Sequence, residues 1–290
     1  MFHLNSRVLD NIAMLHKGLL RRNARQIYAI VEKEINLQLR FKSQFLFILI
    51  NPLIQLVVYF FLFGAIFNIQ QGIAIGYWNS SNYLLFLLIA MSISYSQPII
   101  QKYTQLFATE KYWKTLSAIM IAPVNRISLL VGILISQILL SSIGVIFLLT
   151  LAFILFPITI FELIFFIFTY LCILLIFGSI GLILGAFAIS NENFQNYYFL
   201  VIRFLFLLSC INYPKELFPE IIQFFITLNP LYYLFDFLRL IWYSGLSPTT
   251  AFLYISPIHI ITFILVTILS PIIAVLLFER IYKKHGITGY

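Results

Sequence analysis

The most constraining feature of this sequence is a run from Phe45 to Phe67 that contains no charged residue. A helix needs roughly 20 apolar residues to cross the hydrocarbon core of a bilayer, so this run is long enough to span with some tilt. Similar stretches recur along the chain, which is 62% hydrophobic and only 10% charged, with a mean hydropathy of +1.00. A water-exposed surface does not tolerate this composition. The sequence therefore predicts an all-α, multi-pass membrane protein.

Further apolar runs predict six spans in all. They cover Tyr83–Ile100, Ile127–Phe156, Phe161–Ile189, Tyr197–Asn212 and Ile255–Phe278. Pro52 is expected to kink the first span, and Pro157 to end the third. The predicted organisation is an N-terminal tail (1–44), a six-helix transmembrane domain (45–278) and a C-terminal tail (279–290).

The positive charges indicate the orientation. Most of the 18 Lys and Arg residues lie in the N-terminal tail, in the loop after the second span and in the C-terminal tail. The opposite side is predicted to hold only Lys215 and Arg239. Because Lys and Arg concentrate in cytoplasmic loops, both termini are predicted to face the cytoplasm or its topological equivalent. The net charge of +8 thus follows from topology and does not indicate nucleic acid as a partner.

An amphipathic helix is predicted before the first span. Ile27, Val31, Ile35 and Leu39 recur every four residues, while charged residues project elsewhere. Two interpretations stay open. The helix is either an interfacial anchor on anionic lipid or a surface for a protein partner.

The loop between the second and third spans, residues 101–126, is long for a connection. Its pattern predicts a helix as far as Ile121, which Pro123 stops. Trp113 beside Glu110 and Lys114 gives a face suited to the groove of another protein. Aromatic and basic residues also decorate ordinary membrane interfaces, so both interpretations stay open.

Residues 213–245 are apolar but are interrupted by Pro214, Pro219 and Pro230. At 1.5 Å per residue, the piece from Pro219 to Asn229 reaches only about half the hydrocarbon thickness. We predict a re-entrant helical hairpin, residues 218–227 and then 231–243, entering from the outer face. Irregular backbone at that depth must be buried in protein or touch water, so the hairpin is expected beside a transport path. Asp236 and Arg239 are spaced to pair on one face of the second helix.

These three landmarks, in this order, resemble the ABC-2 family of transporter permeases. In this loop the family has an acidic residue, then Gly-Thr-Leu, then a proline followed by a basic residue. Matching residues here are Glu110, Thr115, Leu116, Pro123 and Arg126. Lys114 stands where the family has glycine. This change is predicted to leave the helix intact, since losing a glycine favours helix, and to alter how the segment docks. Residues 218–239 resemble the re-entrant segment of the family, with Pro219, Asn229, Pro230, Tyr233, Asp236 and Arg239 at matching places.

The resemblance implies the membrane subunit of an ATP-driven exporter for a hydrophobic or lipid- or glycan-type substrate. The amphipathic helix and the 101–121 segment would contact a separate ABC ATPase subunit, whose closure opens a path between two permease copies, identical or different. The other partner is membrane lipid, in a bacterial plasma membrane or a plastid membrane. The chain contains no Gly-x-x-x-x-Gly-Lys stretch to hold phosphates, so ATP hydrolysis is expected in the partner. No catalytic residue, metal or cofactor is predicted.

Four other features have a functional and a simpler interpretation. Arg203, inside the fifth span, costs roughly 2.5–3.5 kcal/mol at the bilayer centre, so it either snorkels to the headgroups or lines the export path. His259 is expected to be interfacial rather than a proton relay. The spacing of Gly181 and Gly185 allows close helix packing. Glu216 and Glu220 are expected to be solvated, because no nucleophile or base accompanies them.

Other functional classes remain as alternatives. A membrane-embedded transferase would need clustered acids or a nucleophile with a base, and the ten acids are scattered. A partner-free carrier driven by ions would need ionisable residues near the midplane or an inverted repeat. A membrane assembly factor would not need the proline-interrupted segment. The spans are filled by Ile, Leu and Phe, which do not identify the cargo.

Overall fold

The computed structural model describes residues 3–69, 75–112, 114, 125–190, 194–246 and 255–285. Over these residues the fold is all-α, as predicted, apart from a β-bridge between Ile75 and Trp78. The helices are α1 (His3–Arg40), α2 (Lys42–Ile69), α3 (Tyr83–Ser96), α4 (Pro98–Tyr112), α6 (Arg126–Leu155), α7 (Ile160–Ser190), α8 (Phe194–Leu207), α9 (Glu220–Leu228), α10 (Pro230–Leu246) and α12 (Pro257–His285), with a short 3-10 helix, Lys215–Leu217, before α9.

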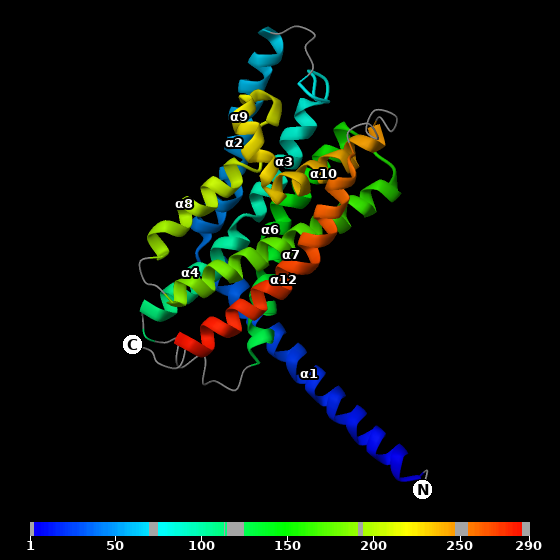
Figure 1. Cartoon of the computed structure of the whole chain (residues 1–290), viewed down its shortest axis with the longest axis vertical. Coiled ribbons are helices and arrows are strands. Elements are labelled where there is room, and N and C mark those ends of the chain that lie inside the picture. The colour runs from blue at the N-terminus through cyan, green and yellow to red at the C-terminus, as the bar shows by residue number, and fades with distance from the viewer. Residues whose placement is uncertain are drawn as a thin grey trace.

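Helix α7 lies at the centre of the bundle. It packs against α4 and α12 along their lengths and against α10, while α6 packs against α3 and α1. Helices α9 and α10 lie at the upper end in Figure 1, which we call the hairpin end. Helix α1 extends away from the opposite end, where α12 also finishes, and we call this the basal end. Both termini therefore lie toward the basal end.

Four helical stretches are long and apolar enough to cross a membrane. They are Tyr83–Tyr112, Ile127–Leu155, Ile160–Ser190 and Pro257–Ile281. The count becomes five if α9 and α10, which are bent by 90° relative to each other, form one broken span. Two shorter apolar stretches, Ile50–Ile66 and Tyr197–Leu207, lie within α2 and α8. The six-span count stays a prediction.

Helices α3 and α4 together form one stretch of 30 residues, Tyr83–Tyr112. It extends the predicted second span by three turns into the segment predicted as a loop. Tyr103 and Phe107 are buried there against α7. A Cβ built on Gly181 would lie 2.8 Å from the carbonyl oxygen of Ile100, so only glycine permits this approach. The close packing predicted from the glycine spacing is confirmed.

The end of α4 corrects one prediction. The helix stops at Tyr112, and Lys114 follows with φ 57°, in the left-handed region, while its N–H donates to the carbonyl of Lys111 at 3.0 Å. The predicted helix is therefore wrong at Lys114; residues 115–121 lie outside the described part of the chain. A left-handed residue after a helix is usually glycine, because a Cβ is strained there. Lysine in place of glycine at this position therefore does not extend the helix.

Candidate functional site

The hairpin end forms around the bend between α9 and α10. Asn229 caps α10, since its Oδ1 accepts from the N–H of Leu231 at 3.0 Å, and Pro230 occupies the first helical position, where no N–H is needed. The other side of the Asn229 amide donates to the carbonyl of Leu205 in α8 at 2.9 Å. Pro219 stands before α9 as its N-cap residue. The two predicted helices are confirmed, while re-entry into a membrane stays a prediction.

Arg239 is buried in this end with only 1% of its surface exposed. Its Nη2 donates to the carbonyl of Cys210 at 3.0 Å and to the carbonyl of Ile211. Cys210 has φ 52°, and this turn follows the end of α8. The guanidinium also lies 4.1 Å from the ring centre of Phe86 in α3, a cation–π distance. Arg239 therefore joins α10 to α3 and to the turn after α8.

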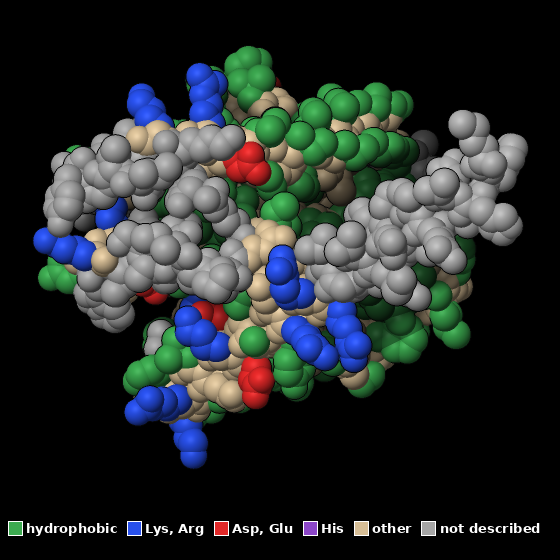
Figure 2. Space-filling model, turned by 90° about the horizontal axis from the view of Figure 1, so that it is seen from below, with side chains coloured by type: hydrophobic (Ala, Val, Ile, Leu, Met, Phe, Trp, Pro, Cys, Tyr) green, Lys and Arg blue, Asp and Glu red, His purple; other side chains and the backbone are tan. Residues whose placement is uncertain are grey.

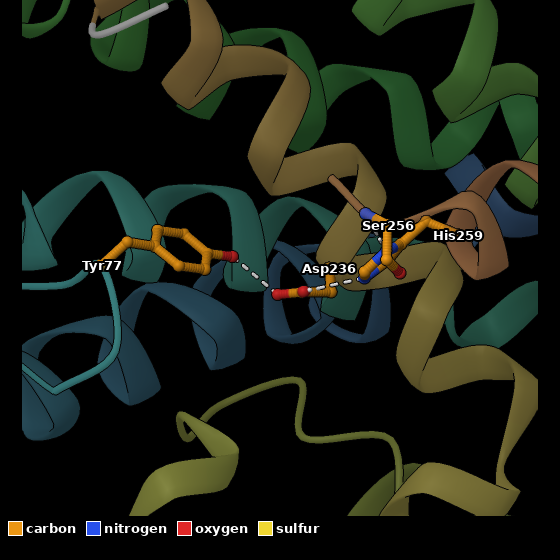
Figure 3. A network of polar contacts seen from close by, with 4 residues as sticks. All are labelled: Tyr77, Asp236, Ser256 and His259. Atoms are coloured by element: carbon orange, nitrogen blue, oxygen red, sulfur yellow. Dashed lines mark hydrogen bonds and ion pairs between the residues drawn. The ribbon is translucent and has the colours of Figure 1, made fainter. Parts of the chain in front are cut away.

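Asp236 is the centre of a second set of contacts (Figure 3). Its Oδ1 accepts from the hydroxyl of Tyr77 at 2.6 Å, and its Oδ2 lies 3.2 Å from Nε2 of His259. Burial and the Asp236 carboxylate raise the pKa of the Tyr77 phenol well above its ordinary value, so the phenol stays protonated and donates. The predicted direct pairing of Asp236 with Arg239 is wrong: among the described residues they bond to different partners.

The bonds around His259 fix its tautomer. Nδ1 of His259 lies 3.2 Å from the backbone nitrogen of Ser256 and 2.8 Å from its Oγ. A backbone N–H can only donate, so Nδ1 accepts and carries no proton. Nε2 then carries the proton and donates a hydrogen bond to Oδ2 of Asp236. His259 is buried at 6% exposure, and its expected position at the membrane interface stays a prediction.

Sequence reasoning missed this role of His259, although a local signal was present. Ser256 precedes α12, Pro257 is its first residue and His259 is its third. A Ser followed three residues later by a side chain that accepts from the backbone of the cap is the pattern of a capping box. The partner Asp236 lies on a separate helix, and no local pattern indicates it.

Ser256, His259 and Asp236 are linked by hydrogen bonds in the same order as the serine, histidine and aspartate of a hydrolase triad. The geometry nevertheless favours a structural role. The acceptor nitrogen of His259 is shared between the backbone and the hydroxyl of Ser256, and the ring is buried. Among the described residues, no group of three His, Cys, Asp or Glu side chains is placed to hold a metal ion. The network joins the turn before α3, α10 and the start of α12.

The basal end contains a buried ion pair. Glu34 of α1 is 3% exposed, and its Oε2 lies 2.7 Å from Nζ of Lys102 in α4. A cavity of about 90 Å³ beside it is lined by residues of α1, α4 and α6, including Ile30 and Glu110. Sequence reasoning missed Glu34, although it falls on the same helical face as Val31 and Ile35. A lone acid inside an apolar stripe was the signal.

The predicted coupling residues lie at the same end. Glu110 is half-buried in the last turns of α4, Lys114 is exposed, and Arg126 is the first residue of α6. Trp113, Thr115, Leu116 and Pro123 lie outside the described part of the chain. Figure 2 shows Lys and Arg side chains gathered over this end of the molecule. Exposed basic residues here include Arg25, Lys33, Lys114, Arg280 and Lys284.

Arg203 lies apart from both groups, on the exposed face of α8. It borders an open hollow of about 470 Å³ together with Phe199, Leu200 and Phe204. The side chain is exposed and no hydrogen bond or ion pair to another described residue is present.

Comparison with protein families finds a match that covers both ends. The model of the family described as ABC-2 type transporter matches residues 25–243, about three quarters of the chain. The matched range begins within α1 and ends within α10, so it includes Glu34, Lys114 and the hairpin. A search of curated proteins finds no match.

Proposed function

This chain belongs to the ABC-2 type transporter family, of which it is a membrane permease, and we propose that it is the permease subunit of an exporter driven by a separate ABC ATPase. The observation that carries the proposal is the arrangement of the basal end. There α1 is joined through Glu34 and Lys102 to α4, which contains the first part of the segment that resembles a coupling loop. A force on that segment would act directly on the 30-residue α3–α4 stretch.

The proposed topology has six spans: α2, α3–α4, α6, α7, α8 and α12, with α9 and α10 as a re-entrant hairpin. Two observations support it. Both termini lie toward the basal end, which requires an even number of crossings. Exposed Lys and Arg side chains gather at that end, as expected for the side facing the cytoplasm or a plastid stroma. The hairpin end would then face outward, and the host membrane would be bacterial or plastid.

The proposed partners are an ABC ATPase, a second permease copy and membrane lipid. Glu110, Lys114 and Arg126, together with Trp113, Thr115, Leu116 and Pro123, would contact the ATPase. Exposed apolar faces of α2 and α8, including Phe61 and Leu200, would meet lipid or the second copy. The path between two copies would carry a hydrophobic or lipid- or glycan-type substrate outward, past the hairpin.

The test is purification of the tagged chain from its native membrane in mild detergent, followed by measurement of vanadate-sensitive ATP hydrolysis. We expect an ATPase to co-purify and its activity to be lost on deletion of Thr115–Ser117 and reduced by Glu110→Ala. Glu220→Ala, an exposed acid at the hairpin end, is the matched control and should have no effect.

A preparation without any ATPase under several extraction conditions would overturn the exporter proposal. The buried pair of Asp236 and His259 would then favour a carrier driven by protons, the second candidate. That function would appear as substrate uptake into vesicles that depends on a pH gradient and not on ATP.

A further inference from the structure

Lys102, Arg239 and Arg203 lie within helices of this protein and differ in how their charges are satisfied. Lys102 pairs with Glu34 at 2.7 Å, and Arg239 donates to two carbonyls and lies over Phe86. Arg203 of α8 is exposed and bonds to no described residue. A cation in a hydrocarbon environment requires an anionic or polar partner, so Arg203 must find its partner outside the described chain.

The surroundings of Arg203 limit what that partner is. Leu200, Phe204 and Leu207 lie beside Arg203 on one face of α8 at helical spacing, and each is more than half exposed. Phe199 and Phe204 border the hollow of about 470 Å³ into which the arginine opens. The site thus combines one planar cation with a broad apolar wall. A ligand that fits both has an anionic group next to a hydrocarbon chain.

The position of Arg203 makes simple snorkelling insufficient. It is the tenth residue of α8, so at 1.5 Å per residue it stands roughly 14 Å above the start of that helix. The hairpin lies above α8 in Figure 1, on the side opposite to the start of the helix. Arg203 therefore stands between the basal end and the hairpin, more than two turns from the start of its helix.

We propose that Arg203 binds the phosphate or carboxylate headgroup of an anionic amphiphile whose apolar chain lies against α8, and that this amphiphile is the class of molecule transported. The planar guanidinium matches a phosphate or carboxylate with two parallel hydrogen bonds, which an ammonium does not do. The inference rests on the proposed function, because it takes the surface of α8 as part of the transport path. It names the substrate class that the sequence did not identify.

The first arm of the test measures binding to the purified chain alone. Dioctanoyl phosphatidic acid, dioctanoyl phosphatidylcholine and inorganic phosphate are titrated separately, and binding is followed by the shift in thermal unfolding. We expect phosphatidic acid to bind best and Arg203→Gln to weaken it by about tenfold, the effect of one charge-assisted contact. Arg203→Lys should lose part of this affinity, and Arg280→Gln, an exposed arginine at the basal end, should lose none.

Three results of this arm would overturn the proposal. They are equal affinity for phosphatidylcholine, unchanged binding in Arg203→Gln, and competition by inorganic phosphate alone at the concentration that the lipid requires. Loss of the fold does not confuse the outcome, because Arg203 is exposed and Arg203→Gln removes a charge from an apolar helix. This arm needs no ATPase, so it still decides the headgroup site if the exporter proposal fails.

The second arm distinguishes cargo from a resident lipid. The chain with its co-purified ATPase is placed in phosphatidylcholine vesicles with and without a small fraction of phosphatidic acid. We expect phosphatidic acid to raise vanadate-sensitive ATP hydrolysis severalfold, and this ratio to fall toward one in Arg203→Gln. Binding without stimulation would identify a resident lipid and would overturn the assignment of the substrate class.

Discussion

The two ends of the bundle hold their buried charges in different ways. At the hairpin end, Asp236 and Arg239 bond to groups on several separate elements, and two of those groups are backbone carbonyls that cannot rotate away. At the basal end, one ion pair between Glu34 and Lys102 joins two helices, and both partners are side chains. The buried charges of the hairpin end are therefore held partly by fixed backbone groups, whereas the buried acid of the basal end is held by a lysine side chain that can rotate away. This difference suits a protein that receives a force at one end and opens at the other.

The largest expected effect tests the rigidity of the hairpin end. Arg239→Met leaves the carbonyls of Cys210 and Ile211 without their donor and removes the nearest positive charge from the buried Asp236 carboxylate. Removing one member of a buried charged group costs roughly 3–5 kcal/mol, and we expect a loss of unfolding free energy in this range. Unfolding in mixed detergent micelles measures it, with Arg280→Met as the exposed control. A loss below about 1 kcal/mol would show that the hairpin end is not held as the contacts indicate.

The second prediction concerns the basal ion pair. Glu34→Gln leaves Lys102 without its counter-charge, but the Lys102 side chain is 17% exposed and reaches some solvent. We therefore expect a smaller loss of about 2 kcal/mol, below the range for a fully buried pair. The double variant Glu34→Gln with Lys102→Met should recover part of it, because both charges are gone.

The same double variant sharpens the comparison between the ends. In the proposed exporter, it should weaken the dependence of ATP hydrolysis on transport substrate more than Tyr77→Phe does, since it acts at the end that receives the force. An equal effect of both variants would contradict the division of roles between the ends.

The third prediction removes one bond from the hairpin end. In Tyr77→Phe, Oδ1 of Asp236 loses its donor while the ring stays in place. A hydrogen bond to a charged group contributes about 1.5–3 kcal/mol, and we expect the lower value because Oδ2 keeps its bond to His259. Thermal unfolding of purified protein measures the change. Tyr112→Phe, at a tyrosine that is 83% exposed, should leave the stability unchanged.

The parts of this structure that local chemistry decides were predictable from the sequence. Uncharged runs indicated the long helices, and Asn229 followed by Pro230 indicated where one helix ends and another begins. The contacts that join the helices were not predictable in this way. The partner of Asp236 is His259 on another helix, and the partner of Glu34 is Lys102, which is remote in the sequence. The helical spacing of Asp236 and Arg239 predicted that they lie close together. It carries no information about the carbonyls and side chains of other elements, which compete for these two residues.

The smallest expected effect concerns the junction between α4 and the coupling segment. Lys114 has φ 57°, where a residue with a Cβ is strained, and glycine relieves that strain. We expect Lys114→Gly to raise the unfolding free energy by about 0.5–1 kcal/mol. Thr109→Gly, on the exposed face inside α4, should lower it by a few tenths, because glycine is unfavourable within a helix. If the two substitutions, which are five residues apart, change the unfolding free energy in opposite directions, the helix ends between Thr109 and Lys114. If both substitutions lower the stability, the helix instead continues through Lys114. A force on the coupling segment would then act on one continuous helix.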